Sequence, residues 1–210
     1  MKIKFFIKKT SLLALPFFIV FTLGLVSAAA DSAIDFTSIT NNSTNDSWSL
    51  GWEFNVTQSI TVTSLGFYDD LMNGLTERHE VGIFDKDKNL LVSGTVSPND
   101  PLSGFFRYTN VTPIVLQIGN DYRIAAVTGS ENYTWDTVDF TVSPEIQFIQ
   151  SRYAETPATT LVYPEIIDVN YGIFGPNFQF ESTAVPEPAT MFLLGSGLIG
   201  ILGLRRKFRK

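Results

Sequence analysis

Short β-rich runs, separated by Gly, Pro, Asn and Asp, fill the chain from residue 34 to residue 180. No apolar pattern of helical period lasts longer than two turns there, so helices are not expected in this stretch. Ten short strands at this spacing predict an all-β fold, a β-sandwich of the jelly-roll-like or Ig-like kind. The predicted strands are residues 34–39, 48–56, 59–68, 79–85, 90–96, 105–109, 114–117, 122–128, 146–152 and 177–180.

Alternating apolar residues within these runs indicate which side chains face the core. Val81 and Ile83 share one face of their strand. Between residues 60 and 67 the apolar parity switches after Val62, which predicts a β-bulge near Ser64 or burial on both faces. Trp52 lies inside a predicted strand and is expected in the core.

Composition sets the class of protein and excludes some partners. The 210 residues include no Cys, so disulfide scaffolds and Cys-ligated metal sites are excluded. Of the 15 Lys and Arg residues, nine lie within residues 1–9 and 205–210. Residues 31–185 therefore keep 6 basic against 20 acidic residues, a net charge near −14. Duplex binding needs a basic face, so nucleic acid is not an expected partner.

The first 30 residues have the three-part layout of a secretory signal peptide. Four Lys residues lie within residues 1–9, an apolar run follows at 12–26, and Ser27 to Ala30 are small. We expect signal peptidase to cut after Ala30, so that residues 31–182 form the exported domain. An uncleaved amphipathic or membrane anchor is the alternative.

Residues 183–210 predict a second targeting signal, at the C-terminal end of the chain. Pro186, Glu187 and Pro188 precede an uncharged stretch at 189–204, which as a helix spans about 24 Å. This is slightly short of the ~30 Å hydrocarbon core, and long basic side chains recover part of the difference. The predicted topology is a single transmembrane helix with a cytoplasmic C-terminus. The basic tail consists of Arg205, Arg206, Lys207, Arg209 and Lys210.

Together, these C-terminal features resemble a PEP-CTERM sorting signal. The resemblance implies recognition and removal of the tail by an exosortase. It also implies transient residence in an inner membrane and then passage to the cell surface or a polysaccharide-rich extracellular matrix. Glu187 between two prolines is held extended and accessible to a protease. The alternative is an ordinary C-terminal anchor behind a stiff Pro-rich linker.

The central part resembles a bacterial exported domain known as domain of unknown function 4082. The resemblance covers residues 48–128 and implies an extracellular β-sandwich without assigned chemistry. Residues 130–180 either complete the sandwich or form a long surface excursion. The matching segments are residues 51–54, 62–69, 74–75, 79–83, 90–93 and 119–122.

No catalytic residue is assigned from the sequence. His79 is the only histidine, so a Ser-His-Asp triad would have to use it. It shares the parity of Val81, which favours a structural histidine that hydrogen-bonds across the 69–80 loop. A carboxylate pair for glycoside hydrolysis is the weaker alternative, drawn from Asp69, Asp70, Glu77 and Glu80.

Asp85 and Asp87 begin a segment that resembles the start of an EF-hand loop. Leu90 stands where that loop needs Gly, and Val96 stands where it needs Glu, so a polar hairpin loop is expected instead. No cofactor is predicted. Structural calcium is left open because acidic loops attract hard cations, with Asp69, Asp70, Asp85 and Asp87 as the candidate ligands.

Aromatic residues make up 13% of the chain; exposed Trp and Tyr would stack on sugar rings, whereas buried ones would belong to an ordinary sandwich core. Trp135, in a polar stretch beside Tyr133, is the best candidate for an exposed stacking platform. The leading hypothesis is a non-enzymatic β-sandwich protein of the cell surface or exopolysaccharide matrix. A carbohydrate-binding module and a glycoside hydrolase are the alternatives.

Overall fold

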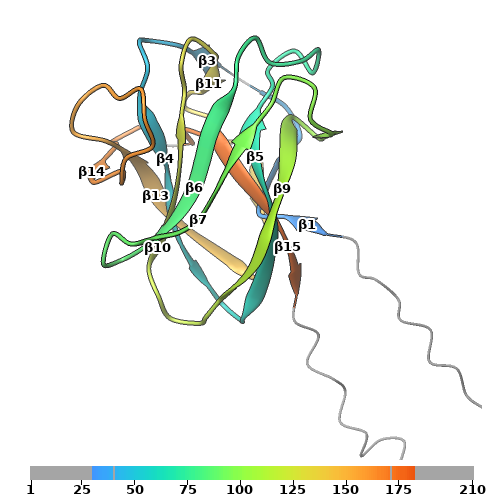
Figure 1. Cartoon of the computed structure of the whole chain (residues 1–210), viewed down its shortest axis with the longest axis vertical. Helices are drawn as coiled ribbons and strands as arrows, with labels where there is room; N and C mark the ends of the chain where they lie inside the picture. Colours follow the sequence, from blue (N-terminus) through green and yellow to red (C-terminus); the bar gives the residue numbers. More distant parts are fainter. Residues whose placement is uncertain (1–29, 40, 171, 183–210) are drawn as a thin grey trace, which may run out of the picture.

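Two antiparallel sheets dominate the computed structural model, which describes residues 30–39, 41–170 and 172–182 (Figure 1). The described residues form strands, turns and loops and contain no helix, so the all-β prediction is confirmed. The five-stranded sheet has the order β1-β15-β5-β9-β8. Its strands are β1 (Asp31–Ser32), β15 (Pro176–Ser182), β5 (Ile60–Tyr68), β9 (Phe106–Leu116) and β8 (Leu102–Ser103).

The second sheet has six strands in the order β14-β13-β4-β10-β6-β7. Its strands are β14 (Ile166–Ile167), β13 (Ile146–Tyr153), β4 (Ser49–Val56), β10 (Tyr122–Val127), β6 (His79–Asp85) and β7 (Leu90–Val96). Two short pairs complete the fold, namely β3 (Asn42–Ser43) with β11 (Tyr133–Thr134) and β2 (Ile34–Phe36) with β12 (Phe140–Val142).

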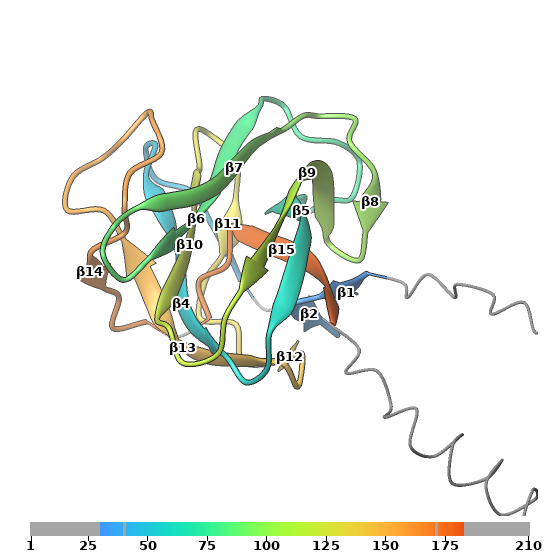
Figure 2. The same cartoon turned by 60° about the horizontal axis from the view of Figure 1, so that its bottom comes forward.

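The two large sheets lie face to face as in a β-sandwich, and Figure 2 shows them as two layers. Aromatic side chains from both sheets fill the space between the layers. Trp52 of β4 stacks on Phe178 of β15, with ring centroids 5.8 Å apart and planes 16° apart. Both side chains are fully buried, and the Trp52 indole N–H donates to the Pro176 carbonyl at 2.9 Å. The core position predicted for Trp52 is therefore confirmed.

β5 contains the irregularity that the apolar parity predicted. Ser64 pairs with Gln179 and Val62 pairs with the next residue, Phe180, so Thr63 is an extra residue in β5. Ile60, Val62, Leu65 and Phe67 are all fully buried despite their change of parity. The bulge thus keeps one face of β5 on the core across the switch.

The same irregularity corrects the prediction of two strands at 105–109 and 114–117. One long strand, β9, runs through Pro113. Opposite Thr63 the pairing jumps from Val62–Ile114 to Ser64–Asn110, so Pro113 falls where the ladder is interrupted. Because Pro has no N–H to donate, it is tolerated at such a position.

Residues 130–180 complete the sandwich, because β13 joins the six-stranded sheet and β15 joins the five-stranded one. β15 also pairs with the start of the described chain, with Asp31 opposite Phe180 and Ser32 opposite Gln179. Across the described residues, no helix is long and apolar enough to cross a membrane. Residues 1–29 of the predicted signal peptide, the predicted transmembrane helix (189–204), the Pro186-Glu187-Pro188 motif and the basic tail lie outside the described residues.

Candidate functional site

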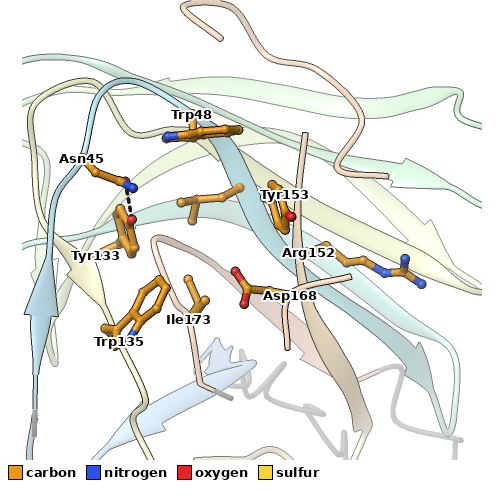
Figure 3. A pocket seen from close by; sticks show the side chains of 9 residues that line it. Asn45, Trp48, Tyr133, Trp135, Arg152, Tyr153, Asp168 and Ile173 are labelled. Carbon is orange, nitrogen blue, oxygen red and sulfur yellow. Dashed lines mark hydrogen bonds between the residues drawn. The ribbon is translucent and has the colours of Figure 1, made fainter. Parts of the chain in front are cut away.

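An aromatic cavity of about 280 Å³ lies at the end of the sandwich where β4 begins and β13 ends (Figure 3). It is lined by side chains from four separate stretches of the chain. Ile173 lines it just before β15 begins. The seven residues of β15 then extend about 20 Å, from Pro176 to Ser182. The described lining residues are Asn45, Trp48, Leu50, Tyr133, Trp135, Arg152, Tyr153, Asp168 and Ile173.

Trp48 and Tyr153 form one aromatic side of the cavity. Trp48 directly precedes β4, and its backbone is fixed by Thr128, whose hydroxyl accepts from the Trp48 N–H at 2.9 Å. Tyr153 ends β13 and pairs with Leu50. The two rings meet edge to face, with centroids 5.8 Å apart and planes at 82°. Adjacent strands of one sheet thus bring together residues separated by more than 100 positions in the sequence.

Tyr133 and Trp135 form a second aromatic side because they flank Thr134 in an extended segment. Residues two apart in such a segment point the same way, and Thr134 points the other way, into the interior. The Thr134 hydroxyl is fully buried, donates to the Gly172 carbonyl and accepts from the Phe174 N–H, each at 2.9 Å. This arrangement turns both rings toward the cavity, with centroids 6.4 Å apart.

Asn45 and Tyr133 form a hydrogen bond at the rim of the cavity. The Tyr133 hydroxyl donates to Oδ1 of Asn45 at 2.6 Å. Burial raises the pKa of the Tyr133 phenol above its ordinary value, and the negative charge of Asp168 adds to the shift. The phenol therefore stays protonated at neutral pH and keeps this bond.

Asp168 and Arg152 are the charged residues among the described lining residues, and their side chains point in different directions. The Asp168 carboxylate points into the cavity, whereas the Arg152 guanidinium points away from it (Figure 3). Nε of Arg152 donates to Oε2 of Glu53 at 2.6 Å, and Nη1 donates to the Glu165 carbonyl at 2.8 Å. The Arg152 guanidinium is therefore held outside the cavity by Glu53, whose Oε2 also lies 3.6 Å from Nε of Arg123, and the aliphatic part of Arg152 forms the wall.

The two residues predicted to stack on sugars both line this cavity, in a different setting from the one expected. Tyr133 is buried, and Trp135 is half-buried in a wall instead of standing as an exposed platform. Trp48, Tyr153 and Asp168 were missed by the sequence reasoning. The first two lie at strand ends, a usable signal, but only the β4–β13 register shows that they meet.

His79 occupies a fully buried structural position. Its Nδ1 donates to the Val127 carbonyl of β10 at 2.9 Å, so its partner lies on the neighbouring strand and not across the 69–80 loop as expected. Burial lowers the pKa of the imidazole, which keeps it neutral.

The four carboxylates weighed for hydrolysis each accept hydrogen bonds from nearby groups. Asp69 is buried and accepts from Nε of Arg107 at 2.6 Å, and Asp70 accepts from Asn132 at 2.8 Å. Glu77 accepts from the Ser130 N–H at 2.6 Å, and Glu80 accepts from the Leu161 N–H at 3.1 Å. None of these four residues lines the aromatic cavity.

The candidate calcium ligands fall into two separate pairs. Asp69 and Asp70 follow β5 in the loop that leads to the start of β6, whereas Asp85 ends β6 and Asp87 lies in the turn beyond it. Asp85 accepts from the backbone N–H groups of Asp87 and Asn89, each at 2.9 Å, which is the polar hairpin loop that was expected. Within the described ranges, no three His, Cys, Asp or Glu side chains gather as a metal site.

Comparison with known protein families gives two matches. Residues 36–166 match the family described as Domain of unknown function (DUF4082), and residues 184–207 match the PEP-CTERM protein-sorting motif. The first match is longer than the 48–128 stretch that carried the resemblance. No curated protein matches the chain. The sorting motif implies processing by an exosortase, with passage through a membrane and then extracellular or surface placement.

Proposed function

Because the chain belongs to the DUF4082 family and ends in a PEP-CTERM sorting motif, we propose that it is an exported β-sandwich protein that binds polysaccharide at the cell surface or in the exopolysaccharide matrix. In this proposal signal peptidase removes residues 1–30. The helix predicted for residues 189–204 would then hold the protein in the inner membrane, with its C-terminus in the cytoplasm, until an exosortase cuts the tail.

The aromatic cavity is the single observation that carries the binding function. Sugar rings present C–H faces that pack on aromatic rings, and their hydroxyl groups need a few well-placed polar partners. Trp48, Tyr133, Trp135 and Tyr153 supply the rings, and Asn45 and Asp168 supply the polar groups. A volume of about 280 Å³ lies near the lower limit for ligand sites, which suits one or two sugar units of a chain.

The cavity favours binding over hydrolysis. A glycosidase of the common type needs two carboxyl groups on opposite sides of the scissile bond. Asp168 is the one acidic side chain among the described residues that line the cavity. We therefore propose a binding module and not a hydrolase.

The place of the cavity suits a protein that is held by its C-terminus. The cavity lies near the start of β15, and the tail continues from the far end of that strand. A tethered domain would thus direct its cavity away from the attachment point. Polysaccharide binding would be compatible with both the anchored and the released protein.

Retention on polysaccharide tests the binding function. The full chain, in mild detergent, is applied to a glycan array and to the matrix polysaccharide of its host. We expect Trp48→Ala and Trp135→Ala each to weaken retention about 10-fold, or about 1.4 kcal/mol. Tyr163→Ala is the matched control, because Tyr163 packs on Phe84 and Arg123 outside the cavity. Absence of any glycan retention, or equal retention by all variants, would refute the proposal.

Cell fractionation tests the sorting. In cells that make an exosortase, we expect the wild-type protein to leave the inner membrane without its tail. Replacement of Pro186, Glu187 and Pro188 by Ala should leave the full-length protein in that membrane. Stable residence of the wild-type chain there, with its tail intact, would contradict this route.

A further inference from the structure

The charge inside the cavity indicates which kind of sugar it holds. We infer that the aromatic cavity binds the protonated amino group of an amino sugar, so that the polysaccharide recognised is a cationic one. This inference rests on the proposed polysaccharide binding and adds the chemical class of the sugar.

The four aromatic rings provide the first argument. The face of an aromatic ring carries partial negative charge and attracts a cation within about 6 Å of its centre, most strongly for Trp. Trp48 presents its face to the cavity, and Tyr133, Trp135 and Tyr153 surround the same space (Figure 3). An ammonium group there would be attracted by several rings at once. A neutral sugar would lack this attraction, because it carries no positive charge.

Asp168 provides the second argument. Its Oδ1 accepts from the backbone and side-chain nitrogens of Asn170, at 2.8 and 2.9 Å, which fixes the carboxylate in place. Its Oδ2 receives no hydrogen bond from the residues that the structure describes. A carboxylate that points into an aromatic cavity with one oxygen available is a suitable partner for an ammonium group.

The direction of the Arg152 guanidinium, which points away from the cavity, provides the third argument. Arg152 is the one basic residue among the described lining residues, and Glu53 binds its guanidinium outside the cavity. Glu53 also accepts from Nε2 of Gln150 at 3.0 Å, which further fixes this pair. The charge that a ligand meets inside the cavity is therefore that of Asp168.

The net charge of the whole domain also favours a cationic ligand. Residues 31–185 contain 6 basic and 20 acidic residues, so the net charge is near −14. Such a surface attracts a polycation over long range and repels acidic polysaccharides. The long-range field and the local charge of the cavity thus select the same class of polymer.

Comparison of two matched oligosaccharides tests this inference. Trp fluorescence of the full chain is titrated with a glucosamine tetramer and with an N-acetylglucosamine tetramer, whose amino groups are acetylated and uncharged. We expect the glucosamine tetramer to bind at least 10-fold more tightly. Asp168→Asn should remove most of that preference, because it should weaken binding of the glucosamine tetramer far more than binding of the acetylated tetramer. Asp87→Asn is the charge-matched control, because Asp87 is exposed in the turn at the far end of β6.

Each outcome separates the charge inference from the proposed function. Equal binding of both tetramers, unaffected by Asp168→Asn, would overturn the charge inference and leave polysaccharide binding intact. Binding of neither tetramer, nor of any glycan on the array, would overturn both. Titration with tetramethylammonium gives the third arm, because tight binding of this ion without binding of the glucosamine tetramer would show that the cation does not come from a sugar. A circular dichroism spectrum equal to that of the wild type confirms that each variant is folded.

Discussion

The imidazole of His79 stacks on the ring of Phe67, with ring centroids 3.8 Å apart and planes 3° apart. His79 belongs to the six-stranded sheet and Phe67 to the five-stranded one, so this stack joins the two layers. Nε2 of His79 is buried and has no hydrogen-bond partner among the described residues. A proton added there would therefore be a buried donor without an acceptor. The two sheets thus pack closely at this point only while His79 is neutral.

Stability should consequently fall in mildly acidic solution. Burial lowers the pKa of His79, so the unfolded chain binds a proton at a pH where the folded protein does not. The free energy of unfolding therefore keeps its full value above the unfolded pKa of about 6.5. It decreases as the pH falls from there towards the lower pKa of the folded protein. Glu77 and Glu131 lie near the imidazole and partly offset the effect. We expect the free energy of unfolding in urea to decrease between pH 7.5 and 5.5.

His79→Phe separates this titration from other groups. Phe keeps the stack on Phe67 but leaves the Val127 carbonyl without its donor, which costs about 1–3 kcal/mol at pH 7.5. The variant should lose its pH dependence between 7.5 and 5.5. The pKa of Glu77 and of Glu145 is lowered by hydrogen bonds, so those groups act only in more acidic solution, below about 4.3. If the free energy of unfolding fell equally between pH 7.5 and 5.5 for the wild type and for the variant, titration of His79 would not be the cause.

Arg107→Met should destabilise the fold by about 3 kcal/mol. Arg107 donates to Asp69, whose side chain is 1% exposed, and its removal leaves a buried carboxylate without a charged partner. Lys86→Met is the matched control, because Lys86 pairs with Asp87 where both side chains are more than half exposed, and such solvent-screened pairs contribute little to stability. Urea unfolding measures both. Similar losses for the two variants would show that burial of the Arg107 pair is unimportant.

Gly172→Ala should be strongly destabilising and should also disturb the cavity. Gly172 has φ of 67°, and a Cβ at this position would lie 1.9 Å from the Thr137 carbonyl oxygen. We expect a loss of more than about 2 kcal/mol, since both backbone strain and a steric clash contribute. Gly119→Ala has φ of 79° but no atom within 4 Å of its Cβ, so it isolates the strain at about 1 kcal/mol. A Gly172 variant as stable as the Gly119 variant would contradict the predicted clash.

Asn177→Leu should cost about 3 kcal/mol although it inserts an apolar residue into the core. The fully buried amide of Asn177 accepts from the Ile34 N–H at 3.2 Å and donates to the Ile34 carbonyl at 2.7 Å. It also donates to the Tyr108 hydroxyl at 3.0 Å. Leu would leave these buried polar groups without partners, which outweighs the gain in apolar area. Thermal unfolding monitored by circular dichroism gives the loss, and unchanged stability would contradict this role of the amide.

The long strands could be predicted because their signals are local. β6 and β7 have the bounds that the pattern predicted, and the parity switch in β5 located the bulge to within one residue. The strand through Pro113 could not be predicted, because proline is tolerated there only through the interrupted pairing opposite Thr63. Strands of two or three residues, such as β1 and β11, owe their existence to partners far away in the sequence and carry no periodic signal.

The candidate site was only half predictable for the same reason. Tyr133 and Trp135 are an aromatic pair visible in the sequence, and both line the cavity. Tyr153 and Asp168 join them only because β13 pairs with β4 and because the backbone N–H of Asp168 donates to the Ser151 carbonyl at 3.0 Å. Convergence of this kind depends on register and loop closure, which no local pattern encodes.

The pairing of Asp31 with Phe180 has a practical consequence for work with this domain. The first and last strands of the described chain lie side by side, so a reporter fused to either end, or a sensor surface coupled to it, would occupy the same pole. Trp48 and Asp168 would remain open to solvent at the other pole in either orientation. A biosensor built on either terminus should therefore report the same dissociation constant.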